Sequence, residues 1–152
     1  MQAYRLIKAK YADDPLNAQG AKQYGGRWNS KGMAAVYASD SIALAALEKL
    51  IHLHRNEVLN HFVLCEITLR EEEIMTLADD ALPEDWRSDP PPSSTIAIGD
   101  EWLSQSESLA LAVPSTVVPR QFNLIINPNH PDFAQLSKSV VVEPFVFDDR
   151  LA

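Results

Sequence analysis

The pattern of apolar and polar residues predicts more strands than helices. Residues 4–11, YRLIKAKY, alternate apolar and polar side chains, as a half-buried strand does. Other apolar runs rich in β-branched or aromatic residues also predict strands. These runs cover residues 34–38, 61–69, 71–77, 109–119, 122–128 and 139–147. Pro144 in the last run favours the edge of a sheet or a bulge, because proline donates no ladder hydrogen bond.

Three segments show the signals of helices. Residues 41–55, SIALAALEKLIHLHR, follow three candidate N-cap residues at positions 39–41. Residues 94–108 carry apolar side chains at mostly helical spacing, and Pro131 can open a short helix over residues 131–138. Strands outnumber helices and do not alternate with them regularly, so an α+β fold is expected.

Two polar stretches predict irregular structure. Residues 13–32 are rich in glycine and have no sustained apolar period, which indicates a long loop. Loops longer than about 12 to 15 residues are uncommon and often functional, so this stretch is a candidate for a functional role. Residues 79–94 are acidic and contain Pro90–Pro92, which marks a surface connection.

Length and composition fit one compact domain over residues 1–152. With 152 residues, of which 46% are hydrophobic, the chain is long enough for one domain with its own core and too short for two ordinary domains. No run reaches the roughly 20 apolar residues that a membrane span needs, and the first ten residues lack the apolar core of a signal peptide. We therefore expect a cytoplasmic protein. The net charge of −8 disfavours direct binding to nucleic acid.

Cysteine and metal chemistry are not indicated. The single cysteine, Cys65, lies in an apolar run and is expected to be a small core residue. The histidines follow no metal-binding spacing, so no metal site is expected. They are His52, His54, His61 and His130. The glycine signatures of Rossmann folds and P-loops and the nucleophile elbow G-x-S-x-G are also missing.

The helix predicted over residues 41–55 contains a conflict between position and residue type. Glu48 shares one helical face with large aliphatic residues, so its carboxylate should be at least partly buried. These aliphatic residues are Leu44, Leu47 and Ile51. A buried carboxylate costs on the order of several kcal/mol unless a cation or hydrogen-bond donors lie beside it. Glu48 therefore has either a structural role, in an ion pair or with its side chain snorkelling to the helix edge, or the role of a catalytic acid that faces a cleft.

Three further candidates each have a structural and a functional interpretation. Arg27 follows Gly25 and Gly26, so its planar guanidinium either grips a phosphate or carboxylate or belongs to an ordinary turn. Tyr37 is either a core aromatic residue or a stacking platform for a base. Ser115 offers a hydroxyl group in the turn VPST, where turn chemistry is the simplest role.

Three blocks together resemble the signature blocks of the RES domain family. They are GGRWNSKGMAAVYASDSIALAALEKL from residue 25, LAVPSTVVP from residue 111 and FNLIINPNHPDF from residue 122. The family is named for an arginine, a glutamate and a serine, and the resemblance runs from Tyr4-Arg5 almost to the C-terminus. The four positions of the family pattern fall on Arg27, Tyr37, Glu48 and Ser115. The stretch over residues 79–94 lies where relatives vary.

The resemblance implies an α+β fold similar to that of ADP-ribosyltransferases of the diphtheria-toxin kind. Two small, mostly antiparallel sheets with flanking helices would enclose an NAD cleft between them. It also implies a toxin of a type II toxin–antitoxin system that depletes NAD by hydrolysis or, with inorganic phosphate, by phosphorolysis. An Xre-type DNA-binding antitoxin would block the active site.

The expected mechanism uses the four family residues. Glu48 would lie beneath the nicotinamide ribose and stabilise the cation that develops when the ribosyl bond breaks. Arg27 would bind diphosphate or inorganic phosphate, Tyr37 would stack on nicotinamide, and Ser115 would hydrogen-bond the ribose or the amide.

Other residues and other functions stay open. Asn29 is a further candidate for NAD binding, Arg5 and Asn123 are candidates of lower rank, and the role of His130 is undetermined. One alternative is an ADP-ribosyltransferase that modifies a specific protein. Another is a non-catalytic module that binds a nucleotide or a partner.

Overall fold

The described residues, 1–53 and 60–151 of the computed structural model, form seven strands, four α-helices and four short 3₁₀ helices. The strands are β1 (Gln2–Lys8), β2 (Val36–Ser39), β3 (Phe62–Thr68), β4 (Ile74–Thr76), β5 (Ala110–Pro114), β6 (Phe122–Ile126) and β7 (Val141–Phe145). The α-helices are α1 (Gln19–Tyr24), α2 (Ile42–His52), α3 (Ser93–Gln105) and α4 (Phe133–Lys138). The 3₁₀ helices are η1 (Ala9–Tyr11), η2 (Glu71–Glu73), η3 (Asp79–Ala81) and η4 (Asp149–Leu151).

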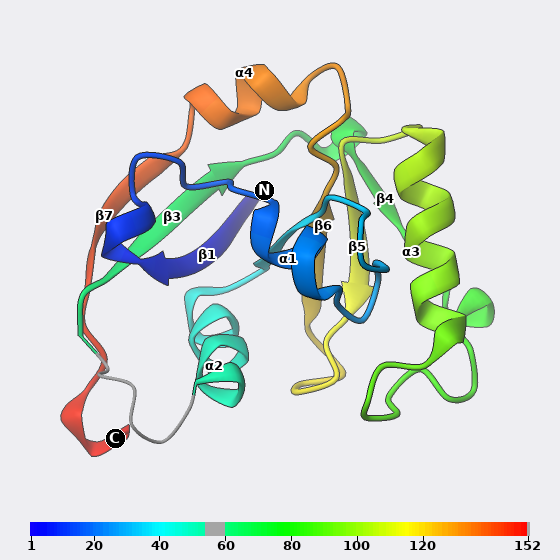
Figure 1. Ribbon diagram of the computed structural model, residues 1–152, viewed down its shortest axis with the longest axis horizontal. Coiled ribbons are helices and arrows are strands. Elements are labelled where there is room, and N and C mark those ends of the chain that lie inside the picture. Colours follow the sequence, from blue (N-terminus) through cyan, green and yellow to red (C-terminus); the bar gives the residue numbers. More distant parts are fainter. Residues whose placement is uncertain (54–59, 152) are drawn as a thin grey trace.

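All seven strands belong to one sheet, in the order β4-β5-β6-β2-β1-β3-β7. The β4–β5 pair is parallel and the other pairs are antiparallel, so the sheet is mixed (Figure 1). The expected α+β class is confirmed, but the expectation of two small sheets is wrong. The reason is that β2 pairs with β6 along its whole length and also meets β1, which joins the two halves into one sheet.

The joint between the two halves of the sheet is narrow. The β1–β2 ladder has a single register pair, Tyr4 with Ser39, whereas β1 pairs with β3 along all of its residues. Beyond that pair the two strands separate. The α2 helix packs against both β1 and β2 at this position.

Most predicted segments contain the expected element. The strand predicted over residues 139–147 contains β7, and β7 is an edge strand as Pro144 indicated. The first strand ends earlier than predicted, at Lys8, because the chain turns there into η1. The segment over residues 13–32 is not a continuous loop, since it contains α1. That helix has six residues and buries none of them, so no apolar period could reveal it.

The cap predicted for the helix over residues 41–55 is confirmed, because the Ser41 hydroxyl accepts a hydrogen bond from the Leu44 amide at 3.1 Å. The described part of this helix ends at His52, and the predicted turn through His54 and Arg55 lies outside the described residues.

The buried face of α2 differs in part from the predicted face. Leu44 is fully buried, but Leu47 and Ile51 are 42% and 57% exposed. The helix instead turns Leu44, Ala45 and the half-buried Glu48 inward. The small Ala45 side chain lets the helix lie close to the joint between β1 and β2.

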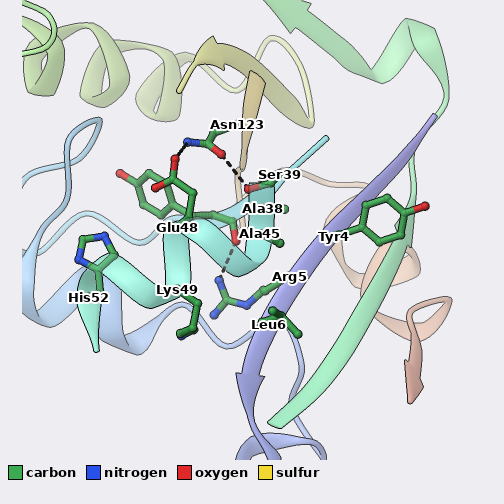
Figure 2. A pocket seen from close by; sticks show the side chains of 11 residues that line it. Tyr4, Arg5, Leu6, Ala38, Ser39, Ala45, Glu48, Lys49, His52 and Asn123 are labelled. Atoms are coloured by element: carbon green, nitrogen blue, oxygen red, sulfur yellow. Dashed lines mark hydrogen bonds between the residues drawn. The ribbon is translucent and has the colours of Figure 1, made fainter. Parts of the chain in front are cut away.

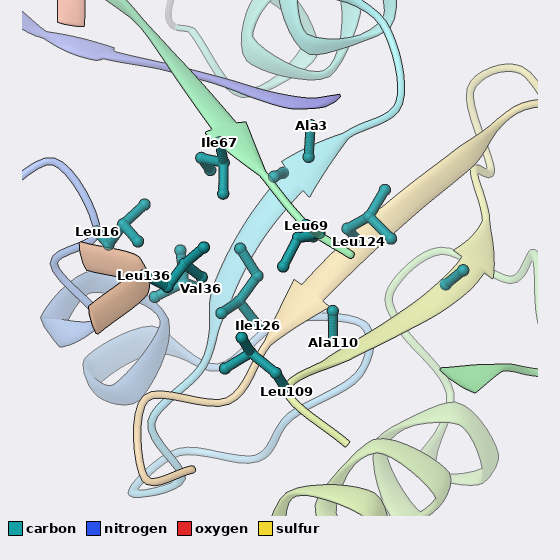
Figure 3. Packing of buried hydrophobic residues seen from close by; sticks show 12 residues of the cluster. Ala3, Leu16, Val36, Ile67, Leu69, Leu109, Ala110, Leu124, Ile126 and Leu136 are labelled. Carbon is teal, nitrogen blue, oxygen red and sulfur yellow. The ribbon is translucent and has the colours of Figure 1, made fainter. Parts of the chain in front are cut away.

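Two of the apolar clusters pack α4 and α3 against the sheet. The first is formed by side chains from β1, β2, β3, β5 and β6 together with α4 (Figure 3). Its members include Ala3, Val36, Ile67, Leu124, Ile126 and Leu136. The second cluster packs α3 against β5 and β6 through Trp102 and Leu103, and Trp28 belongs to it. No helix in the described ranges is both long and apolar enough to cross a membrane.

Candidate active site

A cavity of about 200 Å³ opens where β1 and β2 separate. Side chains from β1, β2, α2 and the start of β6 line it (Figure 2). The lining residues are Tyr4, Arg5, Leu6, Tyr37, Ala38, Ser39, Ala45, Glu48, Lys49, His52 and Asn123. The narrow joint of the sheet is therefore also the place where a small ligand has room.

Glu48 lies in the wall of this cavity with one carboxylate oxygen held by two neutral donors. The Ser115 hydroxyl and the Asn123 amide each donate a hydrogen bond to Glu48 Oε1, and both bonds are 2.7 Å long. Hydrogen bonds to a charged group are stronger than those between neutral groups, so these donors offset part of the cost of burial. Glu48 thus has the set of donors that its position required.

The hydrogen bonds continue from Asn123 into β2. The Ser39 hydroxyl donates to Asn123 Oδ1 at 2.8 Å (Figure 2), and the two residues are register partners in the β2–β6 ladder. Because Asn123 accepts from Ser39 and donates to Glu48, its amide orientation is fixed. The pairing of two strands therefore orients a side chain on α2.

Ser115 lies in the turn that follows β5 and is fully buried. Its hydroxyl oxygen accepts hydrogen bonds from the Val117 and Val118 amides at 3.0 and 3.2 Å while it donates to Glu48. Every hydrogen-bonding position of the hydroxyl group is thus used within the protein. Ser115 lies behind Glu48 and is not one of the side chains that line the cavity within the described residues.

Tyr37 contributes to the cavity wall and is held from behind by Asn29. The Tyr37 hydroxyl donates to Asn29 Oδ1 at 2.6 Å and accepts from the Trp28 amide at 3.1 Å. Burial raises the pKa of the Tyr37 phenol well above its ordinary value, so the hydroxyl group stays protonated. Asn29 is fully buried and donates to the carbonyls of Ala21 and Met33 at 2.8 and 2.9 Å.

The two glycines before Arg27 have different tasks. Gly25 has a φ of +75°, in the left-handed region that favours glycine, and it ends α1. Gly26 lies against the Tyr37–Asn29 hydrogen bond, and a Cβ at this position would come within 2.8 Å of both Tyr37 Oη and Asn29 Oδ1. The turn therefore reaches the back of Tyr37 only because residue 26 has no side chain.

Arg27 makes its hydrogen bonds outside the group around Glu48. Its Nη1 donates to the main-chain carbonyls of Trp86 and Ser88 at 3.0 and 2.6 Å. Both carbonyls belong to the acidic connection between β4 and α3. Of the four residues predicted from the family pattern, the structure brings Tyr37, Glu48 and Ser115 to one joint and holds Arg27 on a neighbouring segment.

Arg5 is a half-buried cation at the cavity. Its Nη1 and Nη2 donate to the carbonyls of Tyr37 and Asn17 at 3.0 and 3.1 Å, at the point where β1 no longer pairs with β2. Its Nε is buried and has no hydrogen-bond partner in the described residues. Burial lowers the pKa of the guanidinium. A positive charge in the cavity wall suits an anionic ligand.

Sequence reasoning missed three polar residues of this site. Ser39 was considered only as a helix cap, but its hydroxyl orients Asn123. Lys49 and His52 line the cavity from α2 (Figure 2). The signal for His52 was its spacing, because residue i+4 from Glu48 lies on the same helical face. Ser39 carried no comparable signal, since its partner is 84 residues away.

Metal and thiol chemistry find no support in the described residues. No group of three or more His, Cys, Asp or Glu side chains among them could hold a metal ion. His130 lies outside the cavity, and its Nδ1 accepts a hydrogen bond from the Asp132 amide at 3.1 Å. Cys65 is fully buried, and burial raises the pKa of its thiol, which reduces the reactive thiolate.

The fold and the site define a class of protein: an α+β protein with one mixed sheet and a cavity centred on a hydrogen-bonded glutamate. The model of the RES domain matches residues 2–148 of this chain. The chain belongs to the RES domain family.

Two relatives support this assignment along nearly the whole chain. A protein called Toxin Res from Yersinia enterocolitica is 44% identical over 151 residues, which cover 99% of this chain and 99% of the relative. A protein called Prs ADP-ribosylating toxin from a Sphingobium species is 39% identical over 145 residues, which cover 93% of this chain and 89% of the relative.

A solved structure shares the fold. The structure described as the Mycobacterium tuberculosis MbcT–MbcA toxin–antitoxin complex contains a chain that superimposes with a TM-score of 0.68. The match covers 95% of this chain and 84% of that chain at 18% sequence identity, so it shows a shared fold and nothing more.

Proposed function

We propose that this protein is a toxin that cleaves the bond between nicotinamide and ribose in NAD. Two observations on relatives support the proposal, since one is called Toxin Res and another an ADP-ribosylating toxin, a name that implies use of NAD. The observation that carries it is the geometry of Glu48, whose Oε1 accepts hydrogen bonds from Ser115 and Asn123 at 2.7 Å beside a cavity.

Glu48 would act by electrostatic stabilisation. When the C–N bond breaks, its electron pair leaves with the nicotinamide nitrogen, and positive charge develops on the ribose, as in glycoside hydrolysis. A carboxylate fixed beneath the ribose stabilises that charge, by roughly 2 to 4 kcal/mol for such a preorganised group. The donors from Ser115 and Asn123 keep Glu48 in place without neutralising it.

The other site residues would bind and orient NAD. The Tyr37 ring stacks on nicotinamide, and Asn29 acts through Tyr37 by fixing its hydroxyl. Ser115 acts through Glu48, because its hydroxyl is fully used within the protein. Arg27 binds the diphosphate or inorganic phosphate through N–H groups other than the pair on Nη1. Arg5 supplies a half-buried positive charge for the anionic part of the ligand.

The acceptor of ADP-ribose is water or inorganic phosphate. Water would give ADP-ribose, and phosphate would give ADP-ribose carrying a phosphate on the anomeric carbon. Both acceptors are small enough to enter a cavity of about 200 Å³ beside a bound ribose.

The test is nicotinamide release by the purified protein, with and without inorganic phosphate. Glu48→Gln keeps the size of the side chain but removes its charge, so release should fall by roughly 100-fold or more. Glu143→Gln on the exposed edge strand β7 is the matched control and should keep the wild-type rate. Release that requires phosphate establishes phosphorolysis, and release without phosphate establishes hydrolysis. No release in either buffer refutes NAD cleavage to a small acceptor.

A second candidate is ADP-ribosylation of a specific protein, which the relative called Prs ADP-ribosylating toxin favours. The same residues would serve, but the acceptor would be a protein side chain. NAD labelled in the adenosine would then leave its label on a protein in a cell extract. Under the main proposal the label stays in small molecules.

We also propose that an Xre-type antitoxin holds the protein inactive. The similar fold of a chain in a toxin–antitoxin complex supports such a partner. The antitoxin would cover the cavity and keep NAD out. Addition of such an antitoxin should stop nicotinamide release once one inhibitor chain is present per toxin chain, and undiminished release would refute inhibition.

A further inference from the structure

The connection from β4 to α3 contacts two turns that carry residues of the site. Its residues 83–92, here called the 83–92 segment, lie at the same end of the molecule as the turn after β5 (Figure 1). Carbonyls of this segment accept hydrogen bonds from Arg27, and its Arg87 side chain donates to the Thr116 carbonyl. Thr116 directly follows Ser115.

Three consecutive residues of the segment make these contacts. The first and third accept hydrogen bonds from Arg27, and the second donates to the turn of Ser115. The carbonyls of Trp86 and Ser88 accept from Arg27 Nη1 at 3.0 and 2.6 Å. Between them, Arg87 donates to Thr116 O through Nε at 3.1 Å and through Nη2 at 2.9 Å. The tripeptide thus forms a bridge between the turn of Arg27 and the turn of Ser115.

The bridge is itself attached to the fold. The Trp86 amide donates to Pro83 O at 3.1 Å, and the Ser88 amide donates to Asp85 O at 2.9 Å, so the segment is a pair of tight turns. Asp85 Oδ1 accepts from the Ser94 hydroxyl at 2.6 Å in the first turn of α3. A segment anchored on a helix can fix the groups that it contacts.

The contact of Arg87 leads to Glu48 through a short chain of bonds. Arg87 holds the carbonyl of Thr116, and the next two amides of the same turn donate to the Ser115 hydroxyl. That hydroxyl donates to Glu48 Oε1. A displacement of this turn would therefore move the donor that orients the carboxylate.

We propose that Arg87 is a positioning residue for the reaction, and that the 83–92 segment holds Arg27 and the Ser115 turn in fixed relation to each other. This inference rests on the proposed cleavage of NAD. The two donors of Arg87 lie in one plane and meet one carbonyl oxygen, a geometry that a lysine cannot reproduce. Because Arg87 contacts an exposed carbonyl and no cavity residue, its effect is on the orientation of Glu48.

The experiment compares Arg87→Ala, Arg87→Lys and the control Arg150→Ala, an exposed and hydrogen-bonded arginine in η4, outside the 115–121 turn. Nicotinamide release gives kcat and KM, and hydrogen–deuterium exchange reports the amides of the peptide over residues 115–121. For Arg87→Ala we expect kcat to fall roughly 10- to 100-fold, as for small displacements of catalytic groups, with KM changed far less. We also expect faster exchange in that peptide and an unchanged melting temperature.

The kcat of Arg87→Lys should fall nearly as far as that of Arg87→Ala, because a lysine keeps the charge but lacks the planar pair of donors that holds the Thr116 carbonyl. Full activity of Arg87→Lys would overturn the inference, since charge alone would then suffice. Wild-type kcat in Arg87→Ala, or a lower kcat without faster exchange in the turn, would also overturn it. If the wild-type protein releases no nicotinamide, the proposed function is wrong. The exchange of residues 115–121 then still tests whether Arg87 holds the turn through the Thr116 carbonyl.

Discussion

At the scale of single residues, the site depends on neutral donors around one carboxylate. Glu48 is half-buried, and its partners among the described residues are a hydroxyl group and an amide group, not a cation. A cation at the same distance would neutralise the charge that is to stabilise the ribose. Neutral donors orient the carboxylate and leave its negative charge in place.

We expect Ser115→Ala to lower nicotinamide release roughly 10- to 100-fold, because a hydrogen bond to a charged group contributes about 1.5 to 3 kcal/mol. The Val117 and Val118 amides lose their acceptor in the same variant, so the free energy of unfolding should fall as well. Initial rates and urea unfolding measure the two effects. Ser137→Ala in α4 is the control, and a wild-type rate for Ser115→Ala would contradict the role given to its hydroxyl.

Tyr37 predicts a dependence of stability on pH. Burial raises the pKa of Tyr37 above its ordinary value of 10.0, so the folded protein keeps this proton after the unfolded chain has lost it. The contribution of Tyr37 to the free energy of unfolding is therefore complete below pH 10 and is lost as the pH rises further. Urea unfolding between pH 8 and 11 should show a steeper loss for the wild type than for Tyr37→Phe.

The variant Tyr37→Phe has a second effect that does not depend on pH. It leaves Asn29 Oδ1 and the Trp28 amide without their partner, which costs about 1 to 3 kcal/mol for a buried group. The free energy of unfolding of Tyr37→Phe should therefore be lower than that of the wild type at neutral pH. It should also fall less steeply above pH 10. Parallel profiles of wild type and variant would show that Tyr37 ionises in the folded protein as in the unfolded chain.

At the scale of elements, the position of α3 depends on one glycine. A Cβ at Gly99 would overlap the main-chain carbonyl of Trp28, so the helix and the turn that carries Arg27 are in direct backbone contact. The Ser30 amide donates to Asp100 Oδ1 at 2.9 Å in the same region. α3 therefore contacts the turn that leads to Tyr37 at Trp28 and at Ser30.

We expect Gly99→Ala to lower the free energy of unfolding by about 1 to 3 kcal/mol, because an added methyl group forces the backbones apart. It should also lower nicotinamide release through the displaced turn. Gly20→Ala in α1 is the matched control, since nothing lies within 4 Å of the added atom. There, alanine should raise stability by about 0.5 to 1 kcal/mol. Equal stability of both variants in urea would contradict the close packing of α3.

Elements with strong periodicity could be predicted from the sequence, and weakly patterned ones could not. β3 lies within the apolar run from residue 61 to residue 69, and the cap of α2 is Ser41 as expected. α1 was missed because it buries none of its residues. The exposed Leu47 and Ile51 show a second limit of prediction from sequence. Helical spacing identifies residues that share a face, but it does not tell which part of that face packs against the sheet.

At the scale of the whole molecule, one sheet creates the cavity at its narrowest joint. β2 belongs fully to the half that contains β6 and meets β1 at a single register pair. The Tyr37 carbonyl accepts a hydrogen bond from Arg5, and α2 forms one wall of the cavity. If NAD binds in this cavity, we expect it to contact residues of both halves of the sheet and so to stabilise their joint.

We expect NAD to stabilise the variant Glu48→Gln, which keeps the cavity but turns over slowly. A ligand at 100 times its Kd adds about 2.7 kcal/mol to the free energy of unfolding. For a chain of this size this corresponds to a rise of roughly 5 to 11 °C in Tm. Thermal melts with increasing NAD measure the shift, adenosine is the control ligand, and a constant Tm would contradict binding of NAD to this cavity.

The sequence by itself determined the α+β class, the edge position of β7 through Pro144, and the conflict that singled out Glu48. Local periodicity indicates which side of a segment is buried, and it can be read from residues that are close together in the sequence. Only the tertiary structure decided that β2 joins one sheet, and that Ser115 and Asn123 hold Glu48 from 67 and 75 residues away. Hydrogen bonds over such separations leave no mark on the local pattern, because they depend on which strands and turns the fold brings together.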